Sequence, residues 1–481
     1  MKKIFLFLLG LGPICNLFSQ GLFSKTFGSP GTFNAAKSLV KTNDSGFAIL
    51  GSTGGWGAEN GDFALIKTDS LGNQQWSKTI GTVQTEEGVS MKLLPDGGFI
   101  LAGNTSTSSG DYNIYVVRTN SVGDTVWTKQ LGGEGWDLCG EIIALSTGGF
   151  CVSGTSYGPS HELGAMSIYG LNSTGNVLWN SFLENEGEQK ASSILEINPG
   201  NIFMAGSAIN PATGSEDMAI TKWASNGNLL WAKFYGTGQE DWISSMCKGP
   251  GASYGIGGNT LMPEGNHQPY MFSIDADGIV MLDGYNPGTS DAELKSIRFN
   301  STANSYLVLM DFNSYSVPQT SNAYMFSPTF EFQCSALFSS LYGKCYGGEL
   351  IQGYNGYIAY TGYSDAYSPG LTSIFLATAG NGCQYSSTVL LSINDEKESE
   401  GNIYPNPTQG TFNVRLDSKI ENPEFILTDI SGKRITIHIL KNNGDYSITI
   451  SDHKPGHYFL SILNDKGQRV FFKPVISEAN Q

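Results

Sequence analysis

Short apolar runs bounded by glycine recur along most of the chain. The clearest copy is Gly-Phe-Ala-Ile-Leu-Gly at 46–51, and related runs follow at 98–103, 149–154, 201–206, 253–257, 305–309 and 356–360. Runs this short, flanked by turn-forming residues, are typical of buried β-strands, whereas a helix needs an apolar face kept over about ten residues or more. The chain therefore holds seven copies of one strand phrase.

A second recurring phrase ends in tryptophan. Trp76, Trp127, Trp179 and Trp231 are separated by 51, 52 and 52 residues, and a turn that contains glycine precedes each of them. A period near 50 residues is typical of β-propellers and related repeat arrays. We expect these tryptophans to occupy equivalent places in successive repeats.

Each repeat supplies four strands, which is one propeller blade. The strand ahead of the apolar phrase has small or slender side chains ten residues before the aromatic, at Val89, Gly140, Ser193, Ser244 and Ser296. Inner strands of a propeller converge on its axis, where bulky side chains would clash, so this pattern favours a propeller over a solenoid. The sequence predicts an all-β protein with a seven-bladed β-propeller over residues 20–392.

The ring of blades has two candidate closing strands. Residues 22–28 resemble the tryptophan strand at 76–81 and would complete the last blade, which would leave no exposed sheet edge. Residues 384–391 compete for the same place.

The N-terminus has the features of a secretory signal peptide, predicted at residues 1–19. Lys2 and Lys3 precede the apolar run 4–11, and Ser19 offers a small residue at the cleavage site. A lipoprotein signal through Cys15 is the weaker alternative, because a large residue precedes the cysteine. No other stretch approaches the ~20 apolar residues of a membrane-spanning helix, so we expect the mature chain to be soluble or held at a surface in another way.

Composition narrows the choice of partners. The net charge is −16 and only 15% of residues are charged. Nucleic acid and anionic membranes require clustered basic residues and are excluded as expected partners. Six cysteines follow the signal peptide, without a CxxC pair, so disulfides are permitted but their pairing stays open.

Motifs that suggest catalysis fall at structural positions of the repeat. The GxSxG pattern at 154–158 lies at a strand end without a following helix, and the Asp-Ala-Asp-Gly sequence at 275–278 lies in a hairpin turn. His453 and His457 flank Pro455-Gly456, which prevents the helix that would align them. We therefore predict no catalytic residues, no bound metal and no cofactor fingerprint.

Acidic residues recur nine to eleven positions after the tryptophan place. In a closed ring they would gather near one mouth of the channel, as a cation or polyol site with calcium as one possible ligand. The favoured alternative is that each carboxylate accepts backbone N–H bonds and joins one blade to the next. The residues are Glu86, Glu87, Asp137, Glu188, Asp241, Asp291 and Glu293.

The C-terminal part begins with a charged linker, predicted at 393–402, followed by a domain at 403–481. Alternating apolar residues at 412–416 and 446–450 predict a small immunoglobulin-like β-sandwich. The phrases at 404–412, 426–434 and 454–462 resemble the type A C-terminal sorting domain of the type IX secretion system of Bacteroidota. The matching residues are Pro405, Asn406, Pro407, Gly410, Phe412, Gly432, Lys433, Pro455, Gly456 and Tyr458.

That resemblance implies partners and a destination. The type IX translocon would read the domain in the periplasm, and a C-terminal signal peptidase would remove it in the linker. The passenger would then be secreted or attached to the outer cell surface.

Three function classes remain for the propeller. We expect a non-enzymatic binding or adhesion module for a glycan or protein ligand. The alternatives are a polysaccharide-active enzyme, such as a glycosidase or lyase, and a structural component of a surface layer. Fold does not separate them, because propellers serve all three.

Overall fold

The computed structural model describes most of the propeller and much of the C-terminal domain. The described residues are 23–28, 32–55, 61–285, 291–312, 320–339, 344–353, 358–368, 371–379, 389–390, 401–405, 408–416, 423–429, 434–442, 445–450, 456–463 and 469–477. Within these ranges every regular element is a β-strand. The predicted signal peptide and most of the predicted linker lie outside them.

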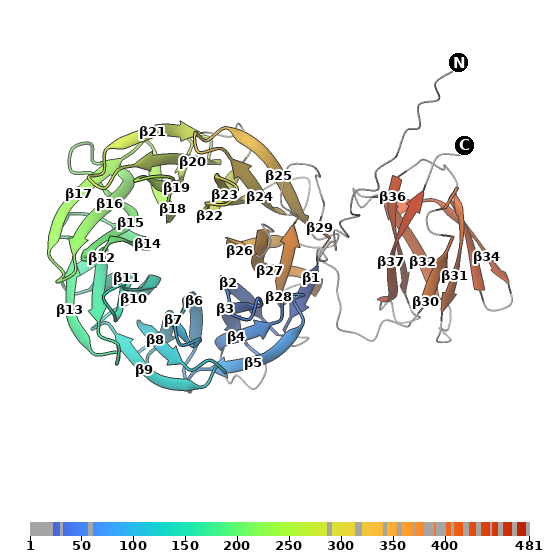
Figure 1. Cartoon of the computed structure of the whole chain (residues 1–481), viewed down its shortest axis with the longest axis horizontal. Helices are drawn as coiled ribbons and strands as arrows, with labels where there is room; N and C mark the ends of the chain where they lie inside the picture. Colours follow the sequence, from blue (N-terminus) through green and yellow to red (C-terminus); the bar gives the residue numbers. More distant parts are fainter. Residues whose placement is uncertain are drawn as a thin grey trace, which may run out of the picture.

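The described strands from 24 to 379 form seven antiparallel blades that surround a central axis (Figure 1). Blade 1 consists of β2 (Asn34–Lys41), β3 (Phe47–Thr53), β4 (Asp62–Thr68) and β5 (Gln74–Ile80). Blade 2 consists of β6 (Glu86–Leu93), β7 (Phe99–Ser106), β8 (Tyr112–Thr119) and β9 (Thr125–Leu131). Blade 3 consists of β10 (Asp137–Ala144), β11 (Phe150–Gly158), β12 (His161–Leu171) and β13 (Val177–Phe182).

Blades 4 and 5 repeat this order. They are β14 (Gln189–Asn198), β15 (Asn201–Ile209), β16 (Glu216–Ala224) and β17 (Leu229–Tyr235), followed by β18 (Glu240–Lys248), β19 (Tyr254–Leu261), β20 (His267–Ile274) and β21 (Val280–Tyr285). The predicted seven-bladed propeller is confirmed.

Blades 6 and 7 each take a strand from elsewhere in the chain. Blade 6 is β22 (Ala292–Asn300), β23 (Ser305–Phe312), β24 (Thr320–Phe326) and β25 (Phe332–Ser339), extended by β29 (Val389–Leu390), which pairs in parallel with β25. Blade 7 is β26 (Cys345–Gln352), β27 (Ile358–Ser368) and β28 (Leu371–Ala379), completed by β1 (Ser24–Phe27). The N-terminal strand therefore closes the ring.

Burial explains why the strand phrases are continuous apolar runs. Strands β3 and β4 are buried along their whole length, because neighbouring blades cover both faces of each sheet. The outer strand β5 is less buried, with Gln74 and Gln75 exposed and most of its other residues half-buried. Core residues of adjacent blades interdigitate, as where Leu50 and Phe63 of blade 1 pack with Met91 and Phe99 of blade 2.

The four tryptophans occupy equivalent places on the outer strands β5, β9, β13 and β17, as predicted. Each ring packs on the hairpin glycine of the next blade, as Trp76 does on Gly123 and Trp127 on Gly175. Both glycines have a φ of +82°, and an added Cβ would lie 2.7–2.8 Å from the tryptophan ring. Glycine is therefore required twice over, by the turn and by the close approach.

The C-terminal domain consists of two packed sheets. The strand order of the first sheet is β30 (Gly401–Tyr404), β31 (Thr411–Leu416), β35 (Asp445–Ile450) and β34 (Ile437–Asn442). The strand order of the second sheet is β33 (Arg434–Ile435), β32 (Glu424–Asp429), β36 (Gly456–Leu463) and β37 (Arg469–Ser477). One buried cluster joins them, with Phe412 and Ile448 from the first sheet and Leu427 and Leu460 from the second. The predicted β-sandwich is confirmed.

The sorting-motif residues have different structural roles. Phe412 and Tyr458 are buried in the sandwich core, Gly410 accepts an N–H from Ile450 at 2.9 Å, and Pro405 is exposed. Gly456 begins β36. The remaining five lie outside the described residues: Asn406, Pro407, Gly432, Lys433 and Pro455.

Candidate functional site: the central channel and its mouth

The innermost strands surround a cavity of about 120 Å³ on the propeller axis. Each of these strands breaks its pairing with a bulge at the same depth, so that one residue per blade is pushed toward the axis. These residues are Lys37, Val89, Gly140, Ser192, Ser244, Lys295 and Gly348. All five small residues that the sequence placed near the axis line this cavity, which confirms their predicted position.

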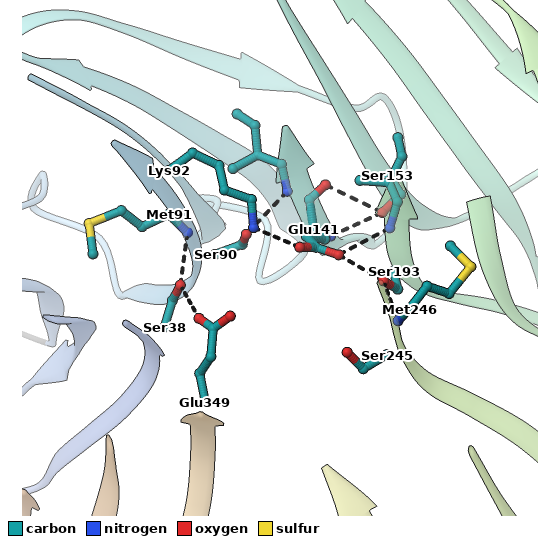
Figure 2. Close-up of polar contacts among 12 residues, drawn as sticks. Ser38, Ser90, Met91, Lys92, Glu141, Ser153, Ser193, Ser245, Met246 and Glu349 are labelled. Atoms are coloured by element: carbon teal, nitrogen blue, oxygen red, sulfur yellow. Dashed lines mark hydrogen bonds and ion pairs between the residues drawn. The ribbon is translucent and has the colours of Figure 1, made fainter. Parts of the chain in front are cut away.

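The residue after each bulge forms a belt that links the blades. Ser38 accepts the N–H of Met91 at 3.2 Å, and Ser193 accepts that of Met246 at 3.2 Å (Figure 2). Ser90 accepts an N–H from the next blade in the same way, at 3.3 Å. Because each bond joins neighbouring blades, the belt holds the inner ends of the sheets in register. Its members are Ser38, Ser90, Glu141, Ser193, Ser245, Ser296 and Glu349.

Glu141 takes the belt position in blade 3. Its carboxylate pairs with Lys92 at 2.7 Å and accepts the Ser193 hydroxyl at 2.8 Å and the Ile194 N–H at 3.1 Å (Figure 2). Burial raises the pKa of Glu141, but the positive charges of Lys92 and Arg298 outweigh it and hold that pKa below its ordinary value. The side chain is therefore an ionised link between three neighbouring blades.

Glu349 takes the same position in blade 7. It forms an ion pair with Arg298 and accepts the Ser38 hydroxyl at 2.8 Å and the Leu39 N–H at 2.9 Å. Arg298 also donates to Ser245 at 2.8 Å. Burial lowers the pKa of Arg298, but Glu349 and Glu141 outweigh burial and raise it. Both channel carboxylates are thus fully engaged.

Sequence reasoning missed the charged residues of the channel. The lining includes four cations, Lys37, Lys92, Lys295 and Arg298, but two carboxylates. The same ten-residue count that found Val89 reaches Lys37 when it starts from Phe47. That signal was present in the sequence, and it departs from the small side chains at this count in blades 2 to 6.

Three of the predicted mouth carboxylates are buried caps of the loops between blades. Glu86 accepts the N–H of Thr82 at 3.0 Å, Asp137 that of Gly133 at 2.9 Å and Asp241 that of Thr237 at 2.7 Å. Burial raises the pKa values of Asp137 and Asp241, and hydrogen bonds from Ser156 and Thr260 and from the loops partly offset this increase.

The other predicted carboxylates lie nearer to solvent at the same end of the inner strands. Glu87 is exposed, and Glu188 pairs with Lys190 at 2.8 Å. Asp291 accepts the N–H of His267 at 2.8 Å, and Glu293 pairs with Lys295. Among the described residues, no three His, Cys, Asp or Glu side chains are placed to hold one metal ion. Calcium binding at this mouth stays an untested alternative.

Aromatic side chains lie around the same mouth, on a surface that we call the aromatic face. Trp136, just before β10, is 47% exposed and meets Tyr112 edge-on with ring centroids 5.4 Å apart. Phe33, just before β2, is 51% exposed and lies 6.5 Å from Tyr363. The first and third strands of an antiparallel blade run in the same direction, so they begin at the same end of the ring. Trp136 and Phe33 precede first strands, as do Glu188 and Asp291, and Glu87 lies near the start of another first strand. These rings and carboxylates therefore lie at the same end of the ring.

Four of the six predicted mature cysteines are free and lie in the propeller. Cys151, Cys247 and Cys345 are buried, Cys139 is half-buried, and burial raises the pKa of Cys247 to about 12. Burial makes the Cys247 thiol a poor nucleophile, because the thiolate is the reactive form. Cys334 lies in β25, and Cys383 lies outside the described residues.

Comparison with known proteins identifies the family of the C-terminal domain. Residues 402–477 match the family model described as the secretion system C-terminal sorting domain. A stretch of 130 residues is 28% identical to the Regulatory protein FlaEY of Caulobacter vibrioides, which is 24% of this chain and 13% of that protein. The chain thus spans a small part of that relative.

Solved structures with a similar shape have little sequence in common with this chain. Sqt1 from Chaetomium thermophilum is 9% identical with a TM-score of 0.41, over 75% of this chain and 100% of that one. The β-propeller domain of the Trilobed protease from Pyrococcus furiosus is 9% identical with a TM-score of 0.44, over 72% and 93%. The described residues include no helix with the length and apolar character to span a membrane.

Proposed function

Because the chain carries the C-terminal sorting domain of the type IX secretion system and is secreted or delivered to the cell surface, we propose that its propeller is a non-enzymatic module that binds a glycan at the aromatic face. The observation that carries this proposal is the exposed Trp136 ring, held edge-on by Tyr112 at the rim of the channel. A sugar presents C–H groups that pack on such a ring and hydroxyls that bond to nearby carboxylates.

The acidic residues of the mouth fit this role. Glu87, Glu188 and Asp291 are accessible on the side of Trp136, and carboxylates accept hydrogen bonds from sugar hydroxyls. The carboxyl groups whose pKa values are raised, Asp137, Asp241 and Asp311, are all buried. A glycosidase instead needs an accessible carboxyl of raised pKa facing a second one across the sugar.

Processing completes the proposed function. The linker at 393–402 would be the cleavage site of a C-terminal signal peptidase, after which the propeller is released or attached at the outer surface. The type IX machinery is the partner implied by the sorting domain itself.

The test is a screen of the purified full chain against immobilised glycans and polysaccharides, scored for retention and for hydrolysis. We expect Trp136→Ala to weaken retention by about tenfold or more, the loss typical of a central aromatic contact. The matched control is Phe332→Ala, because Phe332 is 53% exposed but lies on the outer strand β25. That variant should bind like the unmodified chain.

Two outcomes would overturn the proposal. One is a chain that retains no glycan at all. The other is hydrolysis at an ordinary enzyme rate, about 1 s⁻¹ or faster, that is lost when Glu188 and Asp291 are replaced by alanine. The second result would instead support the polysaccharide-active enzyme.

A further inference from the structure

The charge inside the channel is opposite to that of the whole protein. The chain has a net charge of −16, yet four cations and two carboxylates line the cavity. Lys92 and Arg298 neutralise the two carboxylates, as described above. Lys295 pairs with Glu293, which is not part of the lining. Lys37 therefore supplies positive charge that no carboxylate lining the cavity balances.

Lys37 has no hydrogen-bond or ion-pair partner in the part of the chain that the structure describes. Its side chain lines the cavity and is exposed to the solvent there. The surrounding inner strands still keep it away from bulk solvent. Burial and then the charge of Lys295 lower the pKa of Lys37, and the more distant Glu87 and Asp311 oppose this without reversing it. A bound anion near Lys37 would offset the repulsion between the charges of Lys37 and Lys295.

Gly348 explains how the two lysines share one space. Lys295 lies in blade 6 and Lys37 in blade 1, and the bulge residue of the blade between them is Gly348. A Cβ at Gly348 would lie 2.8 Å from the carbonyl oxygen of Ala36, so only glycine fits there. The blade between the two lysines therefore contributes no side chain to the cavity at this position.

Ser296 is a third polar residue of the cavity lining. It is 3% exposed, lines the cavity, and its hydroxyl has no hydrogen-bond partner. In five of the belt positions that the structure describes, the side chain accepts an N–H from the next blade. A buried hydroxyl without a partner costs free energy, so a ligand oxygen that accepts a hydrogen bond from it would satisfy it.

We propose that the central channel binds a small oxyanion through the ammonium groups of Lys37 and Lys295 and the hydroxyl of Ser296. An oxyanion carries several oxygens on one central atom, and these can accept hydrogen bonds from donors of two different blades. The cavity volume of about 120 Å³ limits the ligand to a small ion or a single acidic group. Such a ligand would bridge blades 6 and 1 across blade 7, where the ring closes.

The experiment titrates sulfate, inorganic phosphate and acetate into the purified full chain by calorimetry in a buffer free of other oxyanions. We expect saturable binding of at least one of these ions. Lys37→Met and Lys295→Met should each weaken it about tenfold or more, and Ser296→Ala about threefold. The matched control is Lys248→Met, at the exposed end of β18, which should bind like the unmodified chain.

Thermal unfolding of the same proteins separates specific binding from the general stabilisation that sulfate gives to most proteins. The specific part should saturate in the unmodified chain and in Lys248→Met, and be absent from Lys37→Met. If Lys37→Met does not fold, Ser296→Ala takes its place, and its specific stabilisation should require about threefold more ligand. No saturable binding of any of the three ions, or equal affinity in all variants, would overturn the proposal. Glycan retention measured in parallel tells this failure apart from that of the aromatic-face proposal.

Discussion

Single side chains of the belt decide how the inner ends of the blades are held. Glu349 accepts from a side chain and a backbone N–H of blade 1 and pairs with Arg298 of blade 6. Ser38, Ser90 and Ser193 at the equivalent positions each accept one N–H from the next blade. The glutamates therefore replace a single hydrogen bond by a charged network, at the cost of burying ions.

We expect Glu349→Ala to destabilise the propeller by about 3–5 kcal/mol, because it leaves the Arg298 charge buried without its partner. Urea unfolding followed by tryptophan fluorescence measures this, since all eight tryptophans precede residue 243 and report on the propeller alone. Glu264→Ala, in an exposed turn, is the control and should change stability by less than about 0.5 kcal/mol. Equal effects of both substitutions would show that the belt adds no stability.

The sequence predicted the place of the channel better than its chemistry. Val89, Gly140, Ser193, Ser244 and Ser296 line the cavity because repeat position alone sets their distance from the axis. The contacts between side chains across the axis depend instead on how the blades are arranged around the ring. Glu141 and Arg298 are 157 residues apart in sequence, and their interaction is visible only once the ring is closed.

At the scale of strands, the tryptophan repeat determines the outer contacts. Each tryptophan packs on the hairpin glycine of the next blade, and the series continues at the ring closure, where the ring of Phe23 lies against Gly72. Phe23 stands next to β1, which explains why residues 22–28 resemble a tryptophan strand. The sequence alone left 384–391 as a competitor, because pairing partners far apart in the chain leave no local signal.

We expect deletion of Ser24–Phe27 to lower the melting temperature of the propeller by about 5–10 °C, because it removes a strand and the buried Phe27 from a core shared by blades 7 and 1. It also exposes the edge of β28, so concentration-dependent association should appear in gel filtration.

The matched change is in β29, which adds two residues in parallel to blade 6. Val389→Ser with Leu390→Ser should shift the melting temperature by no more than about 2 °C. If the two changes had equal effects, β1 would not be the main closure of the ring.

At the scale of the whole molecule, the two folded parts do not share a core. The buried cluster of the C-terminal domain draws all its members from residues 403–475, and every other cluster draws from 23–377. The propeller also closes with its own N-terminal strand rather than with one from the C-terminal domain. Folding of the propeller and recognition by the export machinery are therefore separable.

Deletion of residues 403–481 should leave a folded propeller that stays in the periplasm. The physical reason is that the deletion removes the whole sorting match but breaks none of the propeller cores. Cell fractionation and protease treatment of intact cells measure the location, and the melting curve followed by tryptophan fluorescence measures the fold. Phe412→Ala in the full chain should have the same effect on location, since Phe412 is fully buried in the sandwich core, while Glu264→Ala should be exported normally. Delivery of the shortened chain to the cell surface would mean that export depends on the propeller instead.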